Sequence, residues 1–207
     1  MDWQANHGIS VGGNLTNNGA MAGGHGASAN VYFAPARDPR PTMPALRIFI
    51  NYRSGDDPGT AMLLKQELSR HFGEDNVFID KSGIPPGNDF ERELLSRVRR
   101  SDVVLAIIGP RWLTASHSTG GRAIEREDDW VRRELAEAFA NGVRVVPVLV
   151  NDTARLTGAT LPDDVAPLTK CQYLTLRHGT FEYDLTRIVD QLVKLPNAVT
   201  PREPEVT

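Results

Sequence analysis

The sequence is poor in cysteine: its 207 residues include only Cys171, which cannot form an internal disulfide bond. The five histidines are scattered, and none is grouped with other ligand types at a spacing typical of a metal site. We therefore expect no structural metal and a reducing compartment, the cytoplasm. The longest apolar run, 103–108, is too short to cross a bilayer, and the N-terminus lacks the basic and apolar regions of a signal peptide. No membrane association is expected.

Three common sequence motifs are also missing. Neither GxGxxG nor GxxxxGK[ST] follows the first predicted strand, which argues against a dinucleotide-binding Rossmann domain and a P-loop. No GxSxG motif is present, so acyl-transfer chemistry has no nucleophile. The net charge of -3, with both signs interspersed, provides no basic stripe for nucleic acid. Among the kinds of chemistry considered, only one based on carboxylate side chains remains.

The chain changes composition twice before a regular pattern begins. Residues 1–34 contain no Lys, Arg, Glu or Pro and are rich in Gly and Asn, so they cannot bury enough apolar surface to fold alone. Residues 35–45 contain four prolines, which predict an extended linker. The polar tail 196–207 is predicted to be disordered.

Residues 46–195 alternate β-branched or aromatic runs with helical periodicities, which predicts one α/β domain. Strands are expected at 47–52, 76–80, 101–108, 143–150 and 172–176, and helices near 60–72, after the cap residue Asp89, from about 128, and at 181–195. Right-handed crossovers would give an open parallel sheet with helices on both faces. Pro147 within the fourth strand predicts a bulge or an edge position.

Ligands bind open α/β sheets beyond the carboxyl ends of the strands. Glu134 follows Trp130 by one helical turn, at the predicted border of an apolar stripe. A carboxylate beside an indole ring suits a flat, ribose-bearing ligand. A solvated glutamate beside Arg132 and Arg133 would give the same pattern, and the spacing leaves both interpretations open. Other candidates follow the first two strands: Tyr52, Arg53, Ser54 and Asp80.

Three stretches, in the same order along the chain, resemble the conserved boxes of TIR (Toll/interleukin-1 receptor homology) domains. They are RIFINYRSGDD, VFIDKSGIPPGNDFERELLSRVRRSDVVLAIIGPRWL and DDWVRREL. The resemblance covers 46–195 and implies a flavodoxin-like fold, in which a five-stranded parallel sheet of order 2-1-3-4-5 has helices on both faces.

The resemblance also implies an activity. TIR domains that are enzymes cleave the nicotinamide–ribose bond of NAD+, giving nicotinamide and ADP-ribose or a cyclic form. Glu134 would then be the catalytic glutamate and Trp130 would stack on the ligand, while the substrate pocket would include Tyr52, Arg53, Ser54 and Asp80. NAD+ would be the substrate, with no cofactor or metal. Asn51 replaces the family's usual serine and Ser54 replaces a frequent second arginine, departures that concern the phosphate contacts.

The alternative is a non-catalytic TIR scaffold, which signals by homotypic assembly through the loop KSGIPPGND. In either case other TIR domains are the expected partners, and a homo-oligomer is the expected active form in signalling or immune defence. Residues 1–34 resemble the Gly/Asn-rich amyloid signalling motifs that precede some bacterial effector domains, since low charge and asparagine suit a cross-β stack. A flexible leader is the alternative for this segment.

Overall fold

The computed structural model of the chain describes residues 46–79, 89–118, 120–157 and 160–195. The predicted leader, linker and tail lie outside these residues, as do Asp80 and nearly all of the loop KSGIPPGND. Within the described ranges, no helix combines the length and apolar character needed to span a membrane.

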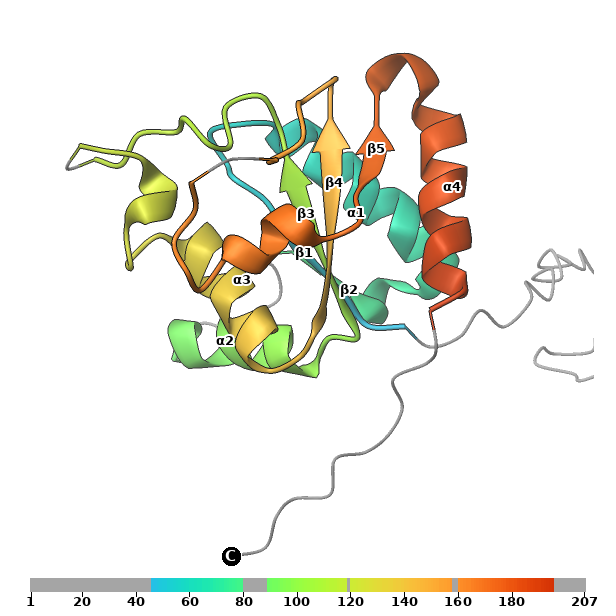
Figure 1. Ribbon diagram of the computed structural model, residues 1–207. Helices are drawn as coiled ribbons and strands as arrows, with labels where there is room; N and C mark the ends of the chain where they lie inside the picture. Colours follow the sequence, from blue (N-terminus) through green and yellow to red (C-terminus); the bar gives the residue numbers. More distant parts are fainter. Residues whose placement is uncertain (1–45, 80–88, 119, 158–159, 196–207) are drawn as a thin grey trace, which may run out of the picture. The chain divides into compact units, whose positions relative to one another are not determined.

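Five parallel strands form one sheet of order β2-β1-β3-β4-β5, which confirms the predicted flavodoxin-like topology (Figure 1). The strands are β1 (Ile48–Asn51), β2 (Val77–Ile79), β3 (Val103–Ile108), β4 (Arg144–Val150) and β5 (Leu174–Leu176). All six residues of β3 are buried, because the strand lies in the middle of the sheet with helices over both faces.

Four α-helices and four short 3-10 turns connect the strands. The helices are α1 (Pro58–Phe72), α2 (Phe90–Arg100), α3 (Trp130–Ala140) and α4 (Phe181–Val193), and the turns are η1 (Glu74–Asn76), η2 (Ala123–Glu125), η3 (Ala166–Lys170) and η4 (His178–Thr180). Three helices begin after an aspartate whose side chain accepts a backbone N–H from the first turn: Asp57, Asp89 and Asp129. The predicted cap at Asp89 is confirmed.

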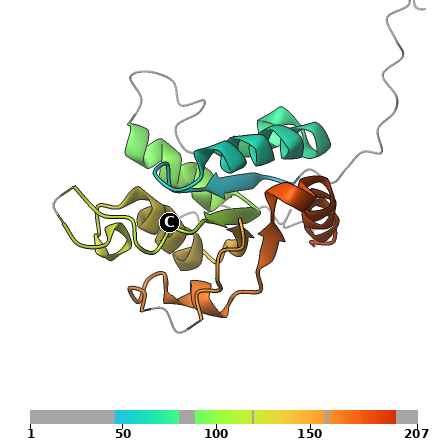
Figure 2. The same cartoon turned by 90° about the horizontal axis from the view of Figure 1, so that it is seen from above.

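The helices cover the two faces of the sheet in pairs (Figures 1 and 2). Helices α1 and α4 pack on one face against Ile48 and Ile50, whereas α2 and α3 pack on the other against Phe49. This division follows from the alternation of side chains along β1. Residues 49, 51 and 53 therefore belong to the side of α3.

Of the two predictions for Pro147, the bulge was wrong, whereas the edge position holds locally. Strand β4 is an interior strand, and its register with β3 continues without a bulge through the pair Ala106 and Pro147. Strand β5 pairs with β4 only from Val148 onward. Pro147 therefore lies just outside the β4–β5 ladder, where the missing N–H interrupts no pairing with β5.

The first turn of α4 is fixed by Asp184, of which 1% is exposed. Its Oδ2 accepts hydrogen bonds from Arg177 N at 3.1 Å, Arg177 Nε at 3.0 Å and Thr180 Oγ1 at 2.8 Å, and its Oδ1 accepts one from Arg177 Nη2 at 3.0 Å. The side-chain bonds from Arg177, helped by Thr180, outweigh the effect of burial and lower the pKa of Asp184 from 3.8 to about 2.

The depressed pKa predicts a pH-dependent contribution to stability. Ionised Asp184 stabilises the fold above pH 4, and this contribution is lost as the pH falls through about 2. We expect Asp184→Asn to lower the free energy of unfolding by about 2 kcal/mol at pH 7 and to flatten its dependence on pH between about 4 and 2. Urea denaturation across this range measures both. The exposed Asp190→Asn on the same helix is the control, and an unchanged pH slope in Asp184→Asn would contradict the assignment.

Candidate active site

Glu134 is held against the carboxyl end of β1 by Asn51. The amide Nδ2 of Asn51 donates to Glu134 Oε2 at 2.6 Å and to the carbonyl oxygen of Val131 at 3.2 Å. Asn51 is fully buried and Glu134 is 3% exposed. The carboxylate therefore lies within the face of α3 that packs on the sheet, deeper than the border position that the sequence pattern predicted.

The depth of Glu134 follows from helical geometry. The buried residues of α3 are Val131, Glu134, Leu135 and Ala138, a spacing of three and four that defines one face. Phe139, which the sequence pattern assigned to this stripe, is only partly buried. A carboxylate is tolerated in the buried face because Asn51 supplies a donor there.

Arg53, two residues after Asn51, holds the beginning of the same helix. Its Nη1 and Nη2 donate to the two carboxylate oxygens of Asp129 at 2.9 and 2.8 Å, and the two side chains are 9% and 10% exposed. Asp129 is also the N-cap of α3, because Oδ2 accepts the N–H of Arg132 at 3.2 Å. Arg53, which was expected in the substrate pocket, thus has both terminal nitrogens in a bidentate ion pair.

The remaining candidates after β1 lie elsewhere. Tyr52 points to the opposite face of the sheet, where it packs against the core under α1 and α4, and Ser54 is exposed. Asp80 lies outside the described residues. The structure therefore brings Arg53 to the start of α3 but does not bring Tyr52 there.

The ring of Trp130 lies among side chains of α2 and α3. The Arg133 guanidinium carbon is 4.4 Å from the ring centroid, and Phe90 makes an edge-on contact at 5.5 Å between ring centroids and 78° between planes. Arg133 also forms an ion pair with Glu91 of α2. One face of the indole that was expected to stack on a ligand is thus covered by Arg133.

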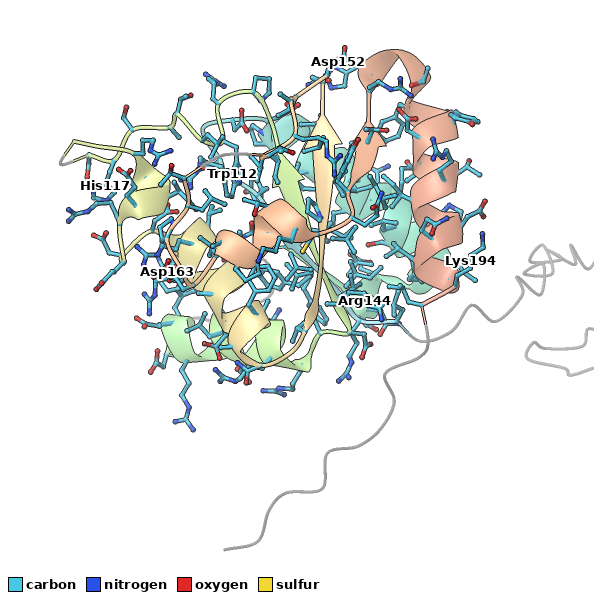
Figure 3. All side chains as sticks on the ribbon, viewed as in Figure 1. Trp112, His117, Arg144, Asp152, Asp163 and Lys194 are labelled. Carbon is cyan, nitrogen blue, oxygen red and sulfur yellow. The ribbon has the colours of Figure 1, made fainter. Side chains whose placement is uncertain are left out.

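Three buried polar atoms near Glu134 have no hydrogen-bond partner among the described residues: Asn51 Oδ1, Arg53 Nε and Trp112 Nε1. Trp112 follows β3 and is fully buried, with its ring centroid 5.8 Å from Arg53 Cζ. Figure 3 shows it inside the fold, whereas His117 lies on the projecting segment that follows. An acceptor and two donors therefore lie unused at this end of the sheet.

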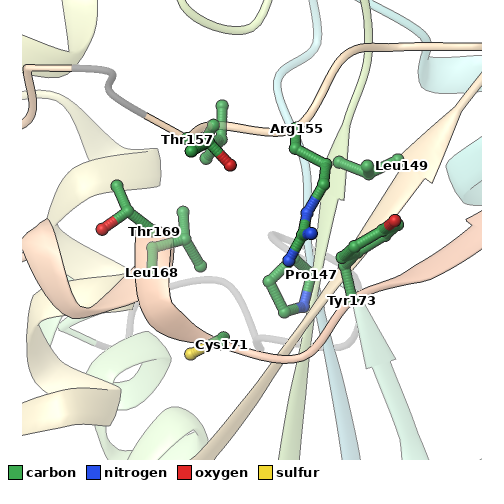
Figure 4. Close-up of a pocket in the computed structure, with 9 residues that line it drawn as sticks. Pro147, Leu149, Arg155, Thr157, Leu168, Thr169, Cys171 and Tyr173 are labelled. Atoms are coloured by element: carbon green, nitrogen blue, oxygen red, sulfur yellow. The ribbon is translucent and has the colours of Figure 1, made fainter.

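A separate small cavity lies between β4, β5 and η3. It is lined in part by Pro147, Leu149, Leu168, Cys171 and Tyr173 and has a volume of about 10 Å³ (Figure 4). That is room for roughly one water molecule. Burial raises the pKa of the Cys171 thiol, which disfavours the reactive thiolate. Neither a nucleotide site nor a nucleophile is found here.

Sequence reasoning missed Asn51 and Asp129 as parts of the site. A signal existed for Asn51: an amide ends the strand IFIN, at a position that alternation assigns to the core. Asp129 is the last of three consecutive acids before the helix, and only the cap geometry distinguishes it from Asp128. In the described part of the chain, no group of three or more His, Cys, Asp or Glu could hold a metal ion.

Asn51 ends β1, Arg53 follows it, and Trp112 follows the neighbouring strand β3. From β1 and β3 the chain order runs in opposite directions across the sheet. This switch point is where open α/β sheets bind ligands. The fold and site define a flavodoxin-like α/β domain with a buried carboxylate at its switch point. The family model of the TIR domain matches residues 48–193, and the chain belongs to this family.

Solved structures resemble the chain at low sequence identity. The TIR domains of the activated Roq1 resistosome, which recognises the pathogen effector XopQ, are 12% identical with a TM-score of 0.54, over 71% of this chain and 99% of that one. The TIR domain of the Toll-related receptor TRR-2 from Hydra magnipapillata is 14% identical, with a TM-score of 0.43 over 69% and 97%. The CMP N-glycosidase BcmB of Clostridium botulinum is 11% identical, with a TM-score of 0.39 over 70% and 98%. Among curated proteins, none matches the chain.

The ion pair between Arg53 and Asp129 predicts a large, coupled effect on stability. Arg53→Met leaves the Asp129 carboxylate nearly buried without its cation, which should cost about 3 kcal/mol of unfolding free energy. Asp129→Asn keeps a capping oxygen but removes the charge, so the double variant should lose less than the sum of the single losses. Urea denaturation of the four proteins measures the coupling. Arg70→Met, at an arginine 59% exposed, is the control, and strictly additive losses would argue against the pair.

Proposed function

We propose that this TIR domain cleaves NAD+ at the bond between nicotinamide and ribose, with Glu134 as the catalytic carboxylate. The observation that supports this proposal is the carboxylate itself, which is 3% exposed and held at 2.6 Å from Asn51 Nδ2 at the carboxyl end of β1. Burial penalises the charge of an acid, so a buried carboxylate at the ligand-binding end of a sheet is a candidate functional group.

The chemistry needs one carboxylate. When the C1′–N bond breaks, nicotinamide leaves as a neutral molecule with the bonding electrons, and positive charge develops on the ribose. A carboxylate in a water-poor site stabilises that charge and binds the ribose hydroxyls, as in glycoside hydrolysis. Water then adds to C1′ and loses a proton, which yields ADP-ribose; attack by a nitrogen of the adenine would yield a cyclic form. The leaving group is already cationic, so no general acid is required.

Substrate contacts beyond Glu134 are part of the same proposal. Ser54 is exposed and Trp130 half-buried, so both remain candidates, together with Tyr52, Arg53 and Asp80. Both terminal nitrogens of Arg53 donate to Asp129, so Arg53 would contact a phosphate only after one of these hydrogen bonds breaks. The burial of Glu134 and the position of Arg133 over Trp130 imply that the site must rearrange to admit NAD+.

Self-assembly is the proposed cause of that rearrangement, with other copies of the domain as partners. The Roq1 TIR domains are part of an activated resistosome, which is the kind of assembly meant. A non-catalytic scaffold is the second candidate function. It is favoured by the covered indole of Trp130 and the ion-paired Arg53, because both side chains already have structural roles.

Glu134→Gln tests the catalytic assignment. Glutamine keeps an oxygen for Asn51 but carries no charge, so nicotinamide release from NAD+ should fall by at least about 100-fold while the fold is retained. Release is measured by chromatography and the fold by circular dichroism, on the full chain.

Glu182→Gln, an exposed glutamate on α4, is the matched control and should keep wild-type turnover. Full turnover in Glu134→Gln would remove Glu134 from the mechanism. No nicotinamide from the wild-type chain, even when it is assembled, would leave the scaffold function.

Activation by assembly has its own test. Turnover per molecule should rise with protein concentration, in step with the oligomeric fraction measured by light scattering. Constant turnover per molecule from a monomer over a roughly 100-fold range of concentration would contradict assembly as the trigger, because mass action links the two.

A further inference from the structure

We infer that Asn51 is a positioning residue for the carboxylate of Glu134: its amide fixes the side chain and the backbone of α3 at the place where the proposed reaction occurs. The hydrogen bonds are seen in the structure, whereas the kinetic consequence rests on the proposed function. The inference is carried by three features of Asn51, namely its two bonds to α3, the orientation of its amide and its unused oxygen.

Asn51 contacts α3 at two points that are three residues apart. One is the Glu134 carboxylate at 2.6 Å and the other is the carbonyl oxygen of Val131 at 3.2 Å. These bonds use both hydrogens of Nδ2. The carboxylate cannot change rotamer without losing one bond, and α3 cannot slide along β1 without losing both.

Chemistry fixes the orientation of the amide. Both atoms that face Nδ2 are acceptors, so a flipped amide would turn its oxygen toward a carboxylate and a carbonyl. The NH2 group must therefore face Glu134, and it stabilises the ionised form of the acid that the proposed mechanism uses.

Asn51 is a poor choice for stability alone. Its Oδ1 is buried and has no hydrogen-bond partner among the described residues. The site is fully enclosed and continues an apolar strand, where leucine would have the same branched skeleton and the same number of side-chain heavy atoms. Replacing a buried polar pair together by apolar residues is often neutral or stabilising. The amide of Asn51 lowers stability here, because its oxygen is buried without a partner. We therefore explain its presence by its hydrogen bond to Glu134, the candidate catalytic acid, which it holds in position.

Two substitutions of Asn51 test the inference in the full chain. Asn51→Asp keeps the shape but replaces the donor with a second carboxylate, and kcat for nicotinamide release should fall by about 100-fold with KM changed less than about threefold. Asn51→Ser keeps a hydroxyl that is too short to reach Glu134, and kcat should fall by about tenfold.

The chain offers a matched control at the other end of the same helix. Asn141 Nδ2 donates to Glu137 Oε1 at 3.0 Å and to the Glu137 carbonyl oxygen at 2.8 Å, a similar pair of bonds remote from Glu134 along α3. Asn141→Asp and Asn141→Ser should keep kcat within about twofold of the wild-type value. Unchanged kcat in both Asn51 variants would overturn the inference, and so would a rise in KM alone, which would make Asn51 a substrate contact.

An NMR measurement tests the hydrogen bond without any activity. The side-chain amide protons of Asn51 should exchange slowly with solvent, and their resonances should move in Glu134→Gln but not in Glu182→Gln. If these signals behave as expected and the wild-type chain releases no nicotinamide, the proposed function fails while the contact stands. If they do not respond to Glu134→Gln, the positioning role is excluded even for an active enzyme.

Asn51→Leu combined with Glu134→Met provides a check on folding. Because both polar partners are removed together, this double variant should unfold at a denaturant concentration equal to or above that of the wild type. A folded, stable and inactive double variant supports the inference that the pair serves the reaction. A double variant that fails to fold would show that the pair serves the fold and would overturn it.

Discussion

The attachment of α3 to the end of β1 is the contact on which the rest of the site depends. Asn51 at the end of β1 binds Glu134, and Arg53 just beyond the strand binds Asp129, so two residues on one side of the chain hold a position within α3 and its N-cap. The spacings match, because two strand residues span about 6.6 Å and five helical residues rise about 7.5 Å. Asn51 precedes Arg53 in the chain, whereas their partners come in the reverse order, with Asp129 before Glu134. This reversal is expected for a helix that runs antiparallel to the strands it connects. One geometric fit thus places both the cap and the carboxylate.

Much of the fold could be predicted from local sequence, because its signals are local. The run 103–108 is apolar throughout and forms the fully buried β3, and Asp89 caps α2 as its position before an amphipathic segment predicts. The strand order came from the resemblance to TIR domains, since parallel strands give no local signal of their neighbours. The depth of Glu134 could not be predicted from α3 alone, because it depends on Asn51, 83 residues earlier. Alternation along β1 places Tyr52 and Arg53 on opposite sides of the sheet, which separates these two candidates.

Unsatisfied polar atoms gather at the same end of the sheet. Four buried side-chain atoms lack a partner in the described ranges, and three of them, Asn51 Oδ1, Arg53 Nε and Trp112 Nε1, belong to residues that follow or end β1 and β3. Each such atom costs about 1–3 kcal/mol when it is kept from water. Local rules of stability tend to be broken at functional sites, so this concentration of cost agrees with the position of the switch point. The burial of apolar side chains between the sheet and helices α1 and α4 stabilises the fold and can offset this loss of stability.

The contacts around Glu134 differ in how easily they break, and this decides how the site could open. Arg133, which covers Trp130, is 26% exposed and its partner Glu91 is 53% exposed, so their ion pair is worth at most about 1 kcal/mol. The pair of Arg53 and Asp129 is nearly buried, and breaking it leaves a charge without compensation. A rearrangement that admits a substrate would therefore break the ion pair between Arg133 and Glu91 and move Arg133 off the ring of Trp130, while α3 stays attached to β1. In such an opening the indole face becomes accessible while Asn51 still holds the carboxylate in place.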